Sequence, residues 1–230
     1  PGEFYQLDLE MAFVEQKDIL ELIEKLFIKM IKEVFPGKKI TKLPFPVITY
    51  DESMKKYGTD KPDLRKNKKD PNELAFCWVI DFPLFEEKIE KGNYAPMHHM
   101  FTMPKEEHWK YLNKKDAKKV KAYQHDLILN GFEVGGGSIR IHKSDIQEKI
   151  FDLIGFDEKQ KKYFKHMLTA FKYGVPPHGG IAPGIDRLLM VIMGEPNIRE
   201  LIAFPKNKEA KDVTFGAPDE ISNLQLKEAN

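Results

Sequence analysis

The segment "HDLILNGFEVGGGSIRIH", residues 125–142, constrains the fold of this chain more than any other stretch. Apolar residues flank Asn130-Gly131, and an Asn-Gly pair supplies the two positive-φ residues that a tight type I′ turn requires. The segment therefore predicts an antiparallel hairpin. Glycines 135–137 interrupt its second strand, although glycine weakens a strand because it has no side chain to pack. We expect either a ligand or a tightly packed helix against that part of the backbone.

Other segments have the periods of helices and strands. "KDILELIEKLFIKMIKEVF" repeats apolar residues along one helix face and stops at Pro36-Gly37. Strands are expected at 4–14, in "PVITY" and in "LAFCWVIDF", short charged helices around 105–122, a helix from about Asp186, and loops at 58–73 and after 205. Because helices do not alternate regularly with strands, the sequence predicts an α+β domain on a mostly antiparallel sheet flanked by helices.

Composition excludes several classes of protein. The 37 Lys and Arg balance the 36 Asp and Glu, so phosphate binding must be local rather than a property of the whole surface. Cys77 is the only cysteine, which rules out a disulfide or a cysteine-based zinc site within one chain and fits a reducing, cytoplasmic setting. The sequence has no apolar run long enough to predict a membrane span.

Asp126 and Glu133 lie on the two arms of the predicted hairpin, at nearly matched distances from its turn. Two carboxylates on adjacent strands can share a hard cation such as Mg²⁺, usually together with substrate phosphates. Two solvated strand carboxylates are the commoner alternative. Arg140 lies seven residues beyond Glu133, so strict alternation puts these side chains on opposite faces unless a bulge in the glycine run realigns them.

A second candidate site is "HGGIAPGIDRLLM". Gly179, Gly180 and Gly184 predict a pliant segment that enters a helix at Asp186-Arg187. The free N–H groups of a helix N-terminus attract anions, and an arginine there can clamp a phosphate. Glycine-rich helix entries also occur without a ligand, and this one is neither the dinucleotide-binding fingerprint nor a P-loop.

Two adjacent histidines, His98 and His99, occur in "MHHMFT". If the segment is a strand, they point in opposite directions, and at most one of them faces a given pocket. Contact with an anionic substrate is one role for that residue, and a packed or surface histidine is the commoner one.

In "EFYQLDLE", Gln6, Asp8 and Glu10 share one strand face by alternation. A row of polar side chains on a buried strand needs partners, which a ligand could supply. Phe4 could stack on a base, but residue frequencies favour a place in the core.

Taken in order, "GEFYQLDLEM", "YGTDKPDLR", "AFCWVIDFP", "MHHMFT", "GFEVGGGSIRIH" and "PPHGGIAPGIDRL" resemble the catalytic domain of bacterial-type aspartyl-tRNA synthetase, a class II enzyme. The match runs essentially end to end. It implies a catalytic domain at 1–205 with the class II antiparallel sheet, and a tail at 206–230 packed on it. It also implies two-step ligase chemistry, in which ATP and L-aspartate give aspartyl-adenylate and the aspartyl group then moves to the 3′ end of tRNA.

The resemblance also implies roles for individual residues. The ATP site would comprise Phe4 stacked on adenine, Glu133, and Gly184, Ile185, Asp186 and Arg187 of the third class II motif. The aspartate site would comprise Gln6, His98, His99 and Arg140, with Arg140 on the substrate side-chain carboxylate. Asp126 and Glu133 would hold Mg²⁺ with ATP and would form the catalytic set with Arg187. The three glycines would let the adenylate lie flat on the sheet.

The chain departs from the family pattern in three ways. It begins inside the second class II motif, so we expect the fold to be incomplete at its N-terminus and the motif's phosphate-binding arginine to be missing. We also expect this stretch of chain to lack the anticodon-binding barrel and to carry a short linker at 66–73 where bacterial enzymes carry a large insertion domain. Pro183 replaces a bulky apolar residue of the third motif, a change that we expect to be tolerated.

The resemblance implies a set of partners and leaves two alternatives. The partners would be ATP, L-aspartate and tRNA-Asp, with tRNA-Asn left open, and a second copy of the full-length chain in a homodimer. One alternative is a tRNA-independent paralogue, similar to asparagine synthetase, that passes the adenylate to ammonia. The other is a non-catalytic fragment that binds a nucleotide or a partner, because activity of the chain by itself is left open.

Overall fold

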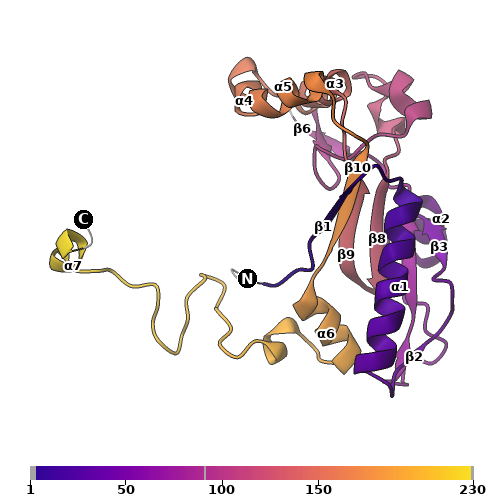
Figure 1. Ribbon diagram of the computed structural model, residues 1–230, viewed down its shortest axis with the longest axis vertical. Helices are drawn as coiled ribbons and strands as arrows, with labels where there is room; N and C mark the ends of the chain where they lie inside the picture. Colours follow the sequence, from indigo (N-terminus) through magenta and orange to yellow (C-terminus); the bar gives the residue numbers. More distant parts are fainter. Residues whose placement is uncertain (1–3, 91, 229–230) are drawn as a thin grey trace.

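A six-stranded sheet forms the centre of the computed structural model, which describes residues 4–90 and 92–228 (Figure 1). The strand order is β1-β10-β9-β8-β5-β3, and only the β3–β5 pair is parallel. The strands are β1 (Leu9–Ala12), β10 (His178–Pro183), β9 (Phe132–Ile139), β8 (Gln124–Leu129), β5 (Phe76–Ile80) and β3 (Val47–Thr49). The mostly antiparallel α+β architecture predicted from the sequence is confirmed.

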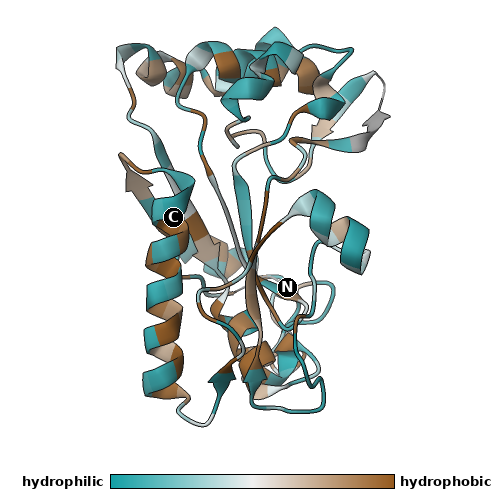
Figure 2. Ribbon diagram, turned by 90° about the vertical axis from the view of Figure 1, so that its right-hand side faces the viewer, coloured by the Kyte–Doolittle hydropathy of each residue, from teal (hydrophilic) through white to brown (hydrophobic). Residues whose placement is uncertain are grey.

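The helix α1 (Gln16–Val34) covers one face of this sheet. Its buried residues, Ile19, Ile23, Phe27 and Ile31, fall at the predicted helical spacing. The Phe27 ring meets the Phe76 ring of β5 edge to face, with centroids 5.8 Å apart. The apolar stripe of α1 alternates with polar residues in Figure 2, so the helix joins the main core on one side and meets solvent on the other.

A lobe of short elements lies at one end of the sheet, and its helical part at 144–173 projects to the side opposite α1 (Figure 1). It contains β6 (Phe85–Glu90), β7 (Asn93–Pro96), the 3₁₀ helices η1 (Glu106–Tyr111) and η2 (Ala117–Lys119), and the helices α3 (Ser144–Ile154), α4 (Glu158–Tyr163) and α5 (Lys165–Tyr173). The helices expected around 105–122 are therefore 3₁₀ turns. Figure 1 places α6 (Ile185–Met193) near the other end of the sheet.

The remaining elements are small. They are α2 (Tyr50–Tyr57), the β2 (Lys39–Ile40) and β4 (Glu73–Leu74) pair, η3 (Ile198–Leu201) and α7 (Asn223–Glu228). The polar stretch at 58–73 is a loop as predicted, and it ends at β4. No helix in the described part of the chain is long and apolar enough to cross a membrane.

The hairpin predicted at Asn130-Gly131 is present. The two turn residues have φ values of 51° and 88°, which the Asn-Gly pair tolerates. Asn130 is also fixed from outside, because its side-chain Oδ1 accepts from the Ala75 N–H at 2.8 Å and its Nδ2 donates to the Glu73 carbonyl at 3.0 Å. These bonds tie the turn to the neighbouring strand.

Two expectations about strands are wrong. The strand expected at 4–14 is confined to Leu9–Ala12, because Phe13 has a positive φ of 59° and Gln6 forms only an isolated bridge with Gly184. The "HGGIAP" segment, expected to be pliant, is the strand β10, which lies between β1 and β9.

The tail also differs from the expectation. Residues 206–228 extend away from the domain in Figure 1 rather than packing on it, and apolar side chains such as Val213 and Phe215 are 73% and 75% exposed. The tail carries the short helix α7, whereas a loop was expected.

The three consecutive glycines have two structural roles. A Cβ added to Gly137 would lie 2.1 Å from the Gly180 carbonyl oxygen and 2.7 Å from the Ile181 Cα, both in the backbone of β10. A Cβ on Gly135 would approach Pro183 to 3.0 Å, whereas Gly136 faces the carboxylates of the candidate site. The neighbour that requires glycine at two of the positions is thus a strand, whereas the sequence predicted either a ligand or a packed helix.

We predict that Gly137→Ala lowers the free energy of unfolding by about 2–3 kcal/mol, because two adjacent strands must separate to admit the methyl group. Urea denaturation measures the change. Gly37→Ala is the matched control, since nothing lies within 4 Å of its added Cβ. An equal, small effect at both positions would contradict the close approach of β9 and β10.

Candidate active site

A one-residue bulge in the hairpin decides which side chains share a face. Ile128 pairs with Glu133, but Leu127 pairs with Gly135, so Val134 is the extra residue of β9. The bulge lies immediately before the glycine run. From the sequence, a bulge in that run was the irregularity that could bring Glu133 and Arg140 onto one face. Without it, Arg140 would fall on the opposite face from Asp126 and Glu133.

With the bulge, the two carboxylates and Arg140 face the same side of the sheet, opposite α1. Asp126 pairs with Gly136, and Ser138 and Arg140 follow Gly136 at intervals of two. A Cβ on Gly136 would lie 3.2 Å from Glu133 Oε1 and 3.3 Å from Asp126 Oδ1. Because Gly136 has no side chain, the space between the two carboxylates above it is open.

Asp126 is buried and already holds two polar neighbours. Gln124 Nε2 donates to Asp126 Oδ1 at 2.8 Å, and His98 Nε2 lies 3.5 Å from Asp126 Oδ2. Gln124 Oε1 is buried with no hydrogen-bond partner in the described part of the chain. A buried acceptor beside a carboxylate calls for a donor, a water or a cation at this point of the site.

Glu133 is more accessible than Asp126, and Lys61 Nζ approaches Glu133 Oε2 to 3.3 Å. Lys61 lies in the loop at 58–73, for which the sequence predicted no role beyond connecting two elements. No set of three or more metal-ligating His, Cys, Asp or Glu side chains gathers in the described residues. Two carboxylates still fit Mg²⁺, because this ion usually keeps several waters and takes one or two carboxylates plus substrate phosphates.

Arg140 is held by side chains from three segments. Its Nε and Nη2 donate to Glu10 Oε1 at 3.2 and 2.6 Å, and its Nη1 donates to Ser138 Oγ at 2.8 Å and contacts the His99 ring. Glu10 reaches Arg140 from β1 by crossing β10 at Gly180, whose added Cβ would lie 2.6 Å from the Glu10 carboxyl carbon. Glycine at 180 therefore keeps the path of this ion pair open.

Both adjacent histidines reach the same face of the sheet. The expectation that they diverge assumed a strand, but the described backbone of 97–101 consists of bends and turns. His98 approaches Asp126 and packs edge-on against the Phe82 ring, whereas His99 contacts Arg140. Burial, with Arg140 and His98 as smaller causes, lowers the pKa of His99 to about 4, so its ring is neutral at pH 7.

A cavity of about 440 Å³ lies beside the carboxylates, towards α6. Its lining includes six of the residues singled out from the sequence: Phe4, Gln6, Glu133, Gly184, Asp186 and Arg187. Gly136 also lines the cavity, so the cavity is continuous with the open space between the two carboxylates. Asp126, His98, His99 and Arg140 lie outside the cavity lining, so the face has a cavity at one end and a charged cluster at the other.

Two residues of the cavity lining, Asp186 and Arg187, have contacts that the sequence did not reveal, and Phe4 is exposed. Phe4 is 64% exposed, so the expectation of a core position is wrong. Asp186 Oδ2 accepts from the Tyr5 N–H at 3.0 Å, and Arg187 Nη1 donates to the Glu133 carbonyl at 2.9 Å. Ile185 contributes through its backbone, since its N–H donates to the Tyr5 carbonyl at 2.9 Å.

Sequence reasoning missed several residues of this face. Gln124 and Lys61 gave no signal, because their relation to the carboxylates depends on strand pairing and on a loop. The sequence groups Glu10 with Gln6 and Asp8 on one face of "EFYQLDLE", but its pairing with Arg140 was not predicted.

Comparison with known proteins settles the family. The model of the family described as "tRNA synthetases class II (D, K and N)" matches residues 1–208. This chain belongs to the class II tRNA synthetases. The aspartate–tRNA(Asp/Asn) ligase of Chlorobium luteolum is 32% identical over 351 aligned positions, with 99% of this chain and 58% of the relative covered. The ligase of that name from Rubrobacter xylanophilus is 33% identical, with 98% and 58% covered.

The synthetase chain thus spans just under three-fifths of the length of these relatives. The alignments extend over 351 and 350 positions although the chain has 230 residues, so the relatives carry additional residues within the aligned span. That these residues fall at 66–73 stays a prediction.

Solved structures show the same fold. The aspartyl-tRNA synthetase from Entamoeba histolytica aligns with a TM-score of 0.64 and 24% identity, covering 91% of this chain and 44% of that one. The asparaginyl-tRNA synthetase from Pyrococcus horikoshii aligns with a TM-score of 0.62 and 21% identity, covering 89% and 49%. At these identities the likeness is evidence for the fold of the synthetase chain.

Two histidines, the buried His125 and the partly buried His99, predict that stability falls in acid. Burial is the main cause that lowers the pKa of His125 to about 3 and that of His99 to about 4, from a usual value of 6.5. Below about pH 6.5 the unfolded chain gains protons that the folded chain does not, so stability decreases as the pH falls.

For the fully buried His125, the loss is about 2 kcal/mol between about pH 6.5 and pH 5. Urea midpoints across that range measure it, and His125→Gln should flatten the slope, whereas His166→Gln on the exposed side of α5 should leave it unchanged. An unchanged slope in His125→Gln would contradict the assignment.

Proposed function

We propose that this chain is part of the catalytic domain of an aspartate–tRNA ligase. It would activate L-aspartate with ATP to aspartyl-adenylate and transfer the aspartyl group to the 3′ end of tRNA. The observation that carries the proposal is the shared face of Arg140 and the Asp126–Glu133 pair, which lies beside the cavity with Phe4 and Arg187. The names of the curated relatives support the same reaction.

The cavity end suits the nucleotide. The exposed ring of Phe4 offers a surface for adenine, and Arg187 at the start of α6 offers a cation for the phosphates. Asp186 and Ile185 hold the Tyr5 backbone, so we assign them to shaping the cavity around Phe4 rather than to direct contact. Gly184 leaves the approach to α6 open, because only an Arg187 atom lies within 4 Å of its added Cβ.

The Arg140 end suits an acidic side chain. The guanidinium is partly buried, and a buried cation favours a bound carboxylate over a neutral amide. In the structure, Glu10 supplies the balancing carboxylate. The substrate carboxylate would join or replace Glu10 at the guanidinium, with neutral His99 on one side and Gln6 towards the nucleotide.

Asp126 and Glu133 would hold Mg²⁺ together with ATP. When bound, this ion neutralises phosphate charge and orients the leaving pyrophosphate. The substrate α-carboxylate can attack the α-phosphorus without a general base, so the protein residues need only position the two substrates and stabilise charge. Gly136 would give the reacting groups room above the sheet.

The partners follow from the same proposal. They are ATP, L-aspartate and tRNA-Asp, with tRNA-Asn as a second substrate in a ligase of the relatives' Asp/Asn type. We also propose that the complete protein works as a cytoplasmic homodimer. The asparaginyl-type structural neighbours keep the alternative of an asparagine-synthetase-like paralogue in view, and a nucleotide-binding chain without catalysis is the other alternative.

Aspartate-dependent exchange of pyrophosphate into ATP tests the first step. We expect exchange with aspartate but not with asparagine, and a loss of at least about 100-fold in Arg140→Gln, because a substrate charge loses its partly buried partner. Lys25→Gln, on the exposed side of α1, removes a charge elsewhere and should retain exchange. Activity of Arg140→Gln equal to that of the control would exclude the proposed aspartate site.

Calorimetric titration with ATP tests the metal site. Asp126→Asn should weaken Mg²⁺-dependent ATP binding by at least about tenfold, because one carboxylate of the pair is lost. ATP binding without Mg²⁺ should change little. Asp145→Asn on the exposed side of α3 is the matched control, and equal Mg²⁺ dependence in both variants would remove Asp126 from the metal site.

A further inference from the structure

The helices α4 and α5 are rich in lysine. Residues 158–173 contain five lysines and a single carboxylate, Glu158. Lys161 Nζ forms ion pairs with Glu158 Oε1 at 3.3 Å and with Asp152 Oδ1 at 2.6 Å. The other four lysines are exposed, and no described carboxylate pairs with them: they are Lys159, Lys162, Lys165 and Lys172. We call these four lysines the α4–α5 basic face.

The packing of the lobe fixes this surface in place. Phe164, between α4 and α5, stacks on Phe156 and also contacts the rings of Phe151 and Phe101, with centroids 5.2 to 5.9 Å apart. The four rings anchor the two helices on α3, so the lysines lie on the outer side. A fixed surface where lysines outnumber carboxylates, on a chain with a net charge of only +1, indicates a partner of opposite charge.

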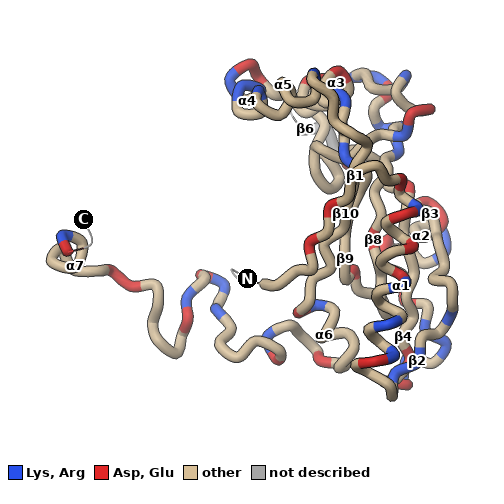
Figure 3. The backbone as a smooth tube through the Cα atoms, viewed as in Figure 1, with Lys and Arg blue, Asp and Glu red and all other residues tan. Residues whose placement is uncertain are grey.

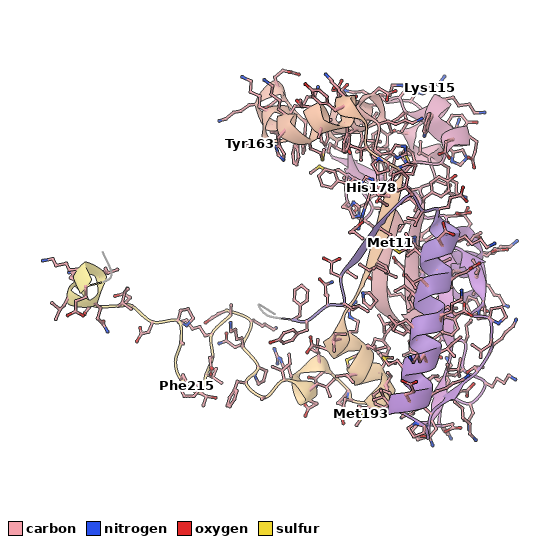
Figure 4. All side chains as sticks on the ribbon, viewed as in Figure 1. Met11, Lys115, Tyr163, His178, Met193 and Phe215 are labelled. Atoms are coloured by element: carbon pink, nitrogen blue, oxygen red, sulfur yellow. The ribbon has the colours of Figure 1, made fainter. Side chains whose placement is uncertain are left out.

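Two tyrosines accompany the lysines. Tyr163 and Tyr173 are 67% and 89% exposed, and Figure 4 shows Tyr163 near the projecting end of the lobe. Exposed aromatic rings among cations are typical of single-stranded nucleic acid surfaces, where bases stack on rings while lysines follow the phosphates. An acidic protein partner would not need the exposed rings.

The position of the basic face relates it to the candidate active site. The helices α4 and α5 project to the side opposite α1 (Figure 1), and Figure 3 shows blue segments beside a red one at α4. That side is also the face of the sheet that carries Asp126 and Arg140. The chain runs from α5 through a short connection at 174–177 into β10, which leads to Gly184 and Arg187.

We propose that the α4–α5 basic face binds the sugar–phosphate backbone of the RNA whose 3′ end enters the active site. The inference rests on the proposed function for the identity of the RNA. The lysines neutralise phosphates of the strand near its end, and the two tyrosines contact unpaired bases. RNA binding by this face does not require the adenylation step.

Fluorescence anisotropy with labelled, unfractionated tRNA tests the face in the intact chain. The variant is Lys162→Gln/Lys165→Gln/Lys172→Gln, and the control is Lys17→Gln/Lys25→Gln/Lys29→Gln on α1, which removes the same charge from the opposite side. We expect the variant to bind tRNA at least about tenfold more weakly at 0.1 M salt and to lower the slope of log K against log salt by about 2, because each neutralised phosphate contributes about 0.7–0.9.

Equal losses in the variant and the control would overturn the proposal, because binding would then follow net charge alone. Vesicles with about one-third phosphatidylserine form a second arm, and lysine-dependent binding to vesicles as tight as to tRNA would also overturn it. Pyrophosphate exchange separates the two proposals, since the lysine variant should keep the exchange rate of the parent chain. If neither the parent chain nor its variants catalysed exchange, but tRNA binding still depended on the lysines, the proposed function would be contradicted. The proposal for the α4–α5 basic face would then still hold.

Discussion

The one-residue bulge at Val134 is the constraint on which the candidate site depends. It leaves Glu133 paired with Ile128, on the same face as Asp126, and moves the rest of β9 by one register position. As a result Gly136, Ser138 and Arg140 join the carboxylates on one face, and Gly135 and Gly137 turn towards β10. Strict alternation would place Arg140 on the opposite face from the two carboxylates. The single extra residue in β9 instead brings all three charged side chains onto one face.

The collected charges are then balanced across three strands. Arg140, at the end of β9, pairs with Glu10 of β1, and the carboxylate passes over Gly180 of β10. Since a partly buried guanidinium without a carboxylate would be costly, Glu10 keeps the unliganded site stable. The same pairing means that an acidic ligand meets a pre-oriented arginine, whereas a neutral one offers no charge to compensate.

The sequence predicted the parts of the fold that depend on local signals. The hairpin followed from Asn130-Gly131, and α1 and α6 followed from helical spacing and from the stop at Pro36-Gly37. The shared face of the hairpin residues could not be derived, because Val134 has no property that marks it as the bulged residue. Positions that depend on long-range contacts were also beyond reach, including Lys61 beside Glu133 and the exposed tail after 205.

The cross-strand nuclear Overhauser effects of the 124–138 hairpin test the central claim most directly. A bulge at Val134 predicts that Asp126 faces Gly136 and Leu127 faces Gly135, while Ile128 still faces Glu133. A regular ladder would instead pair Asp126 with Gly135 and Leu127 with Val134. Observation of the regular pattern would place Arg140 on the opposite face from the carboxylates and would contradict the site as described.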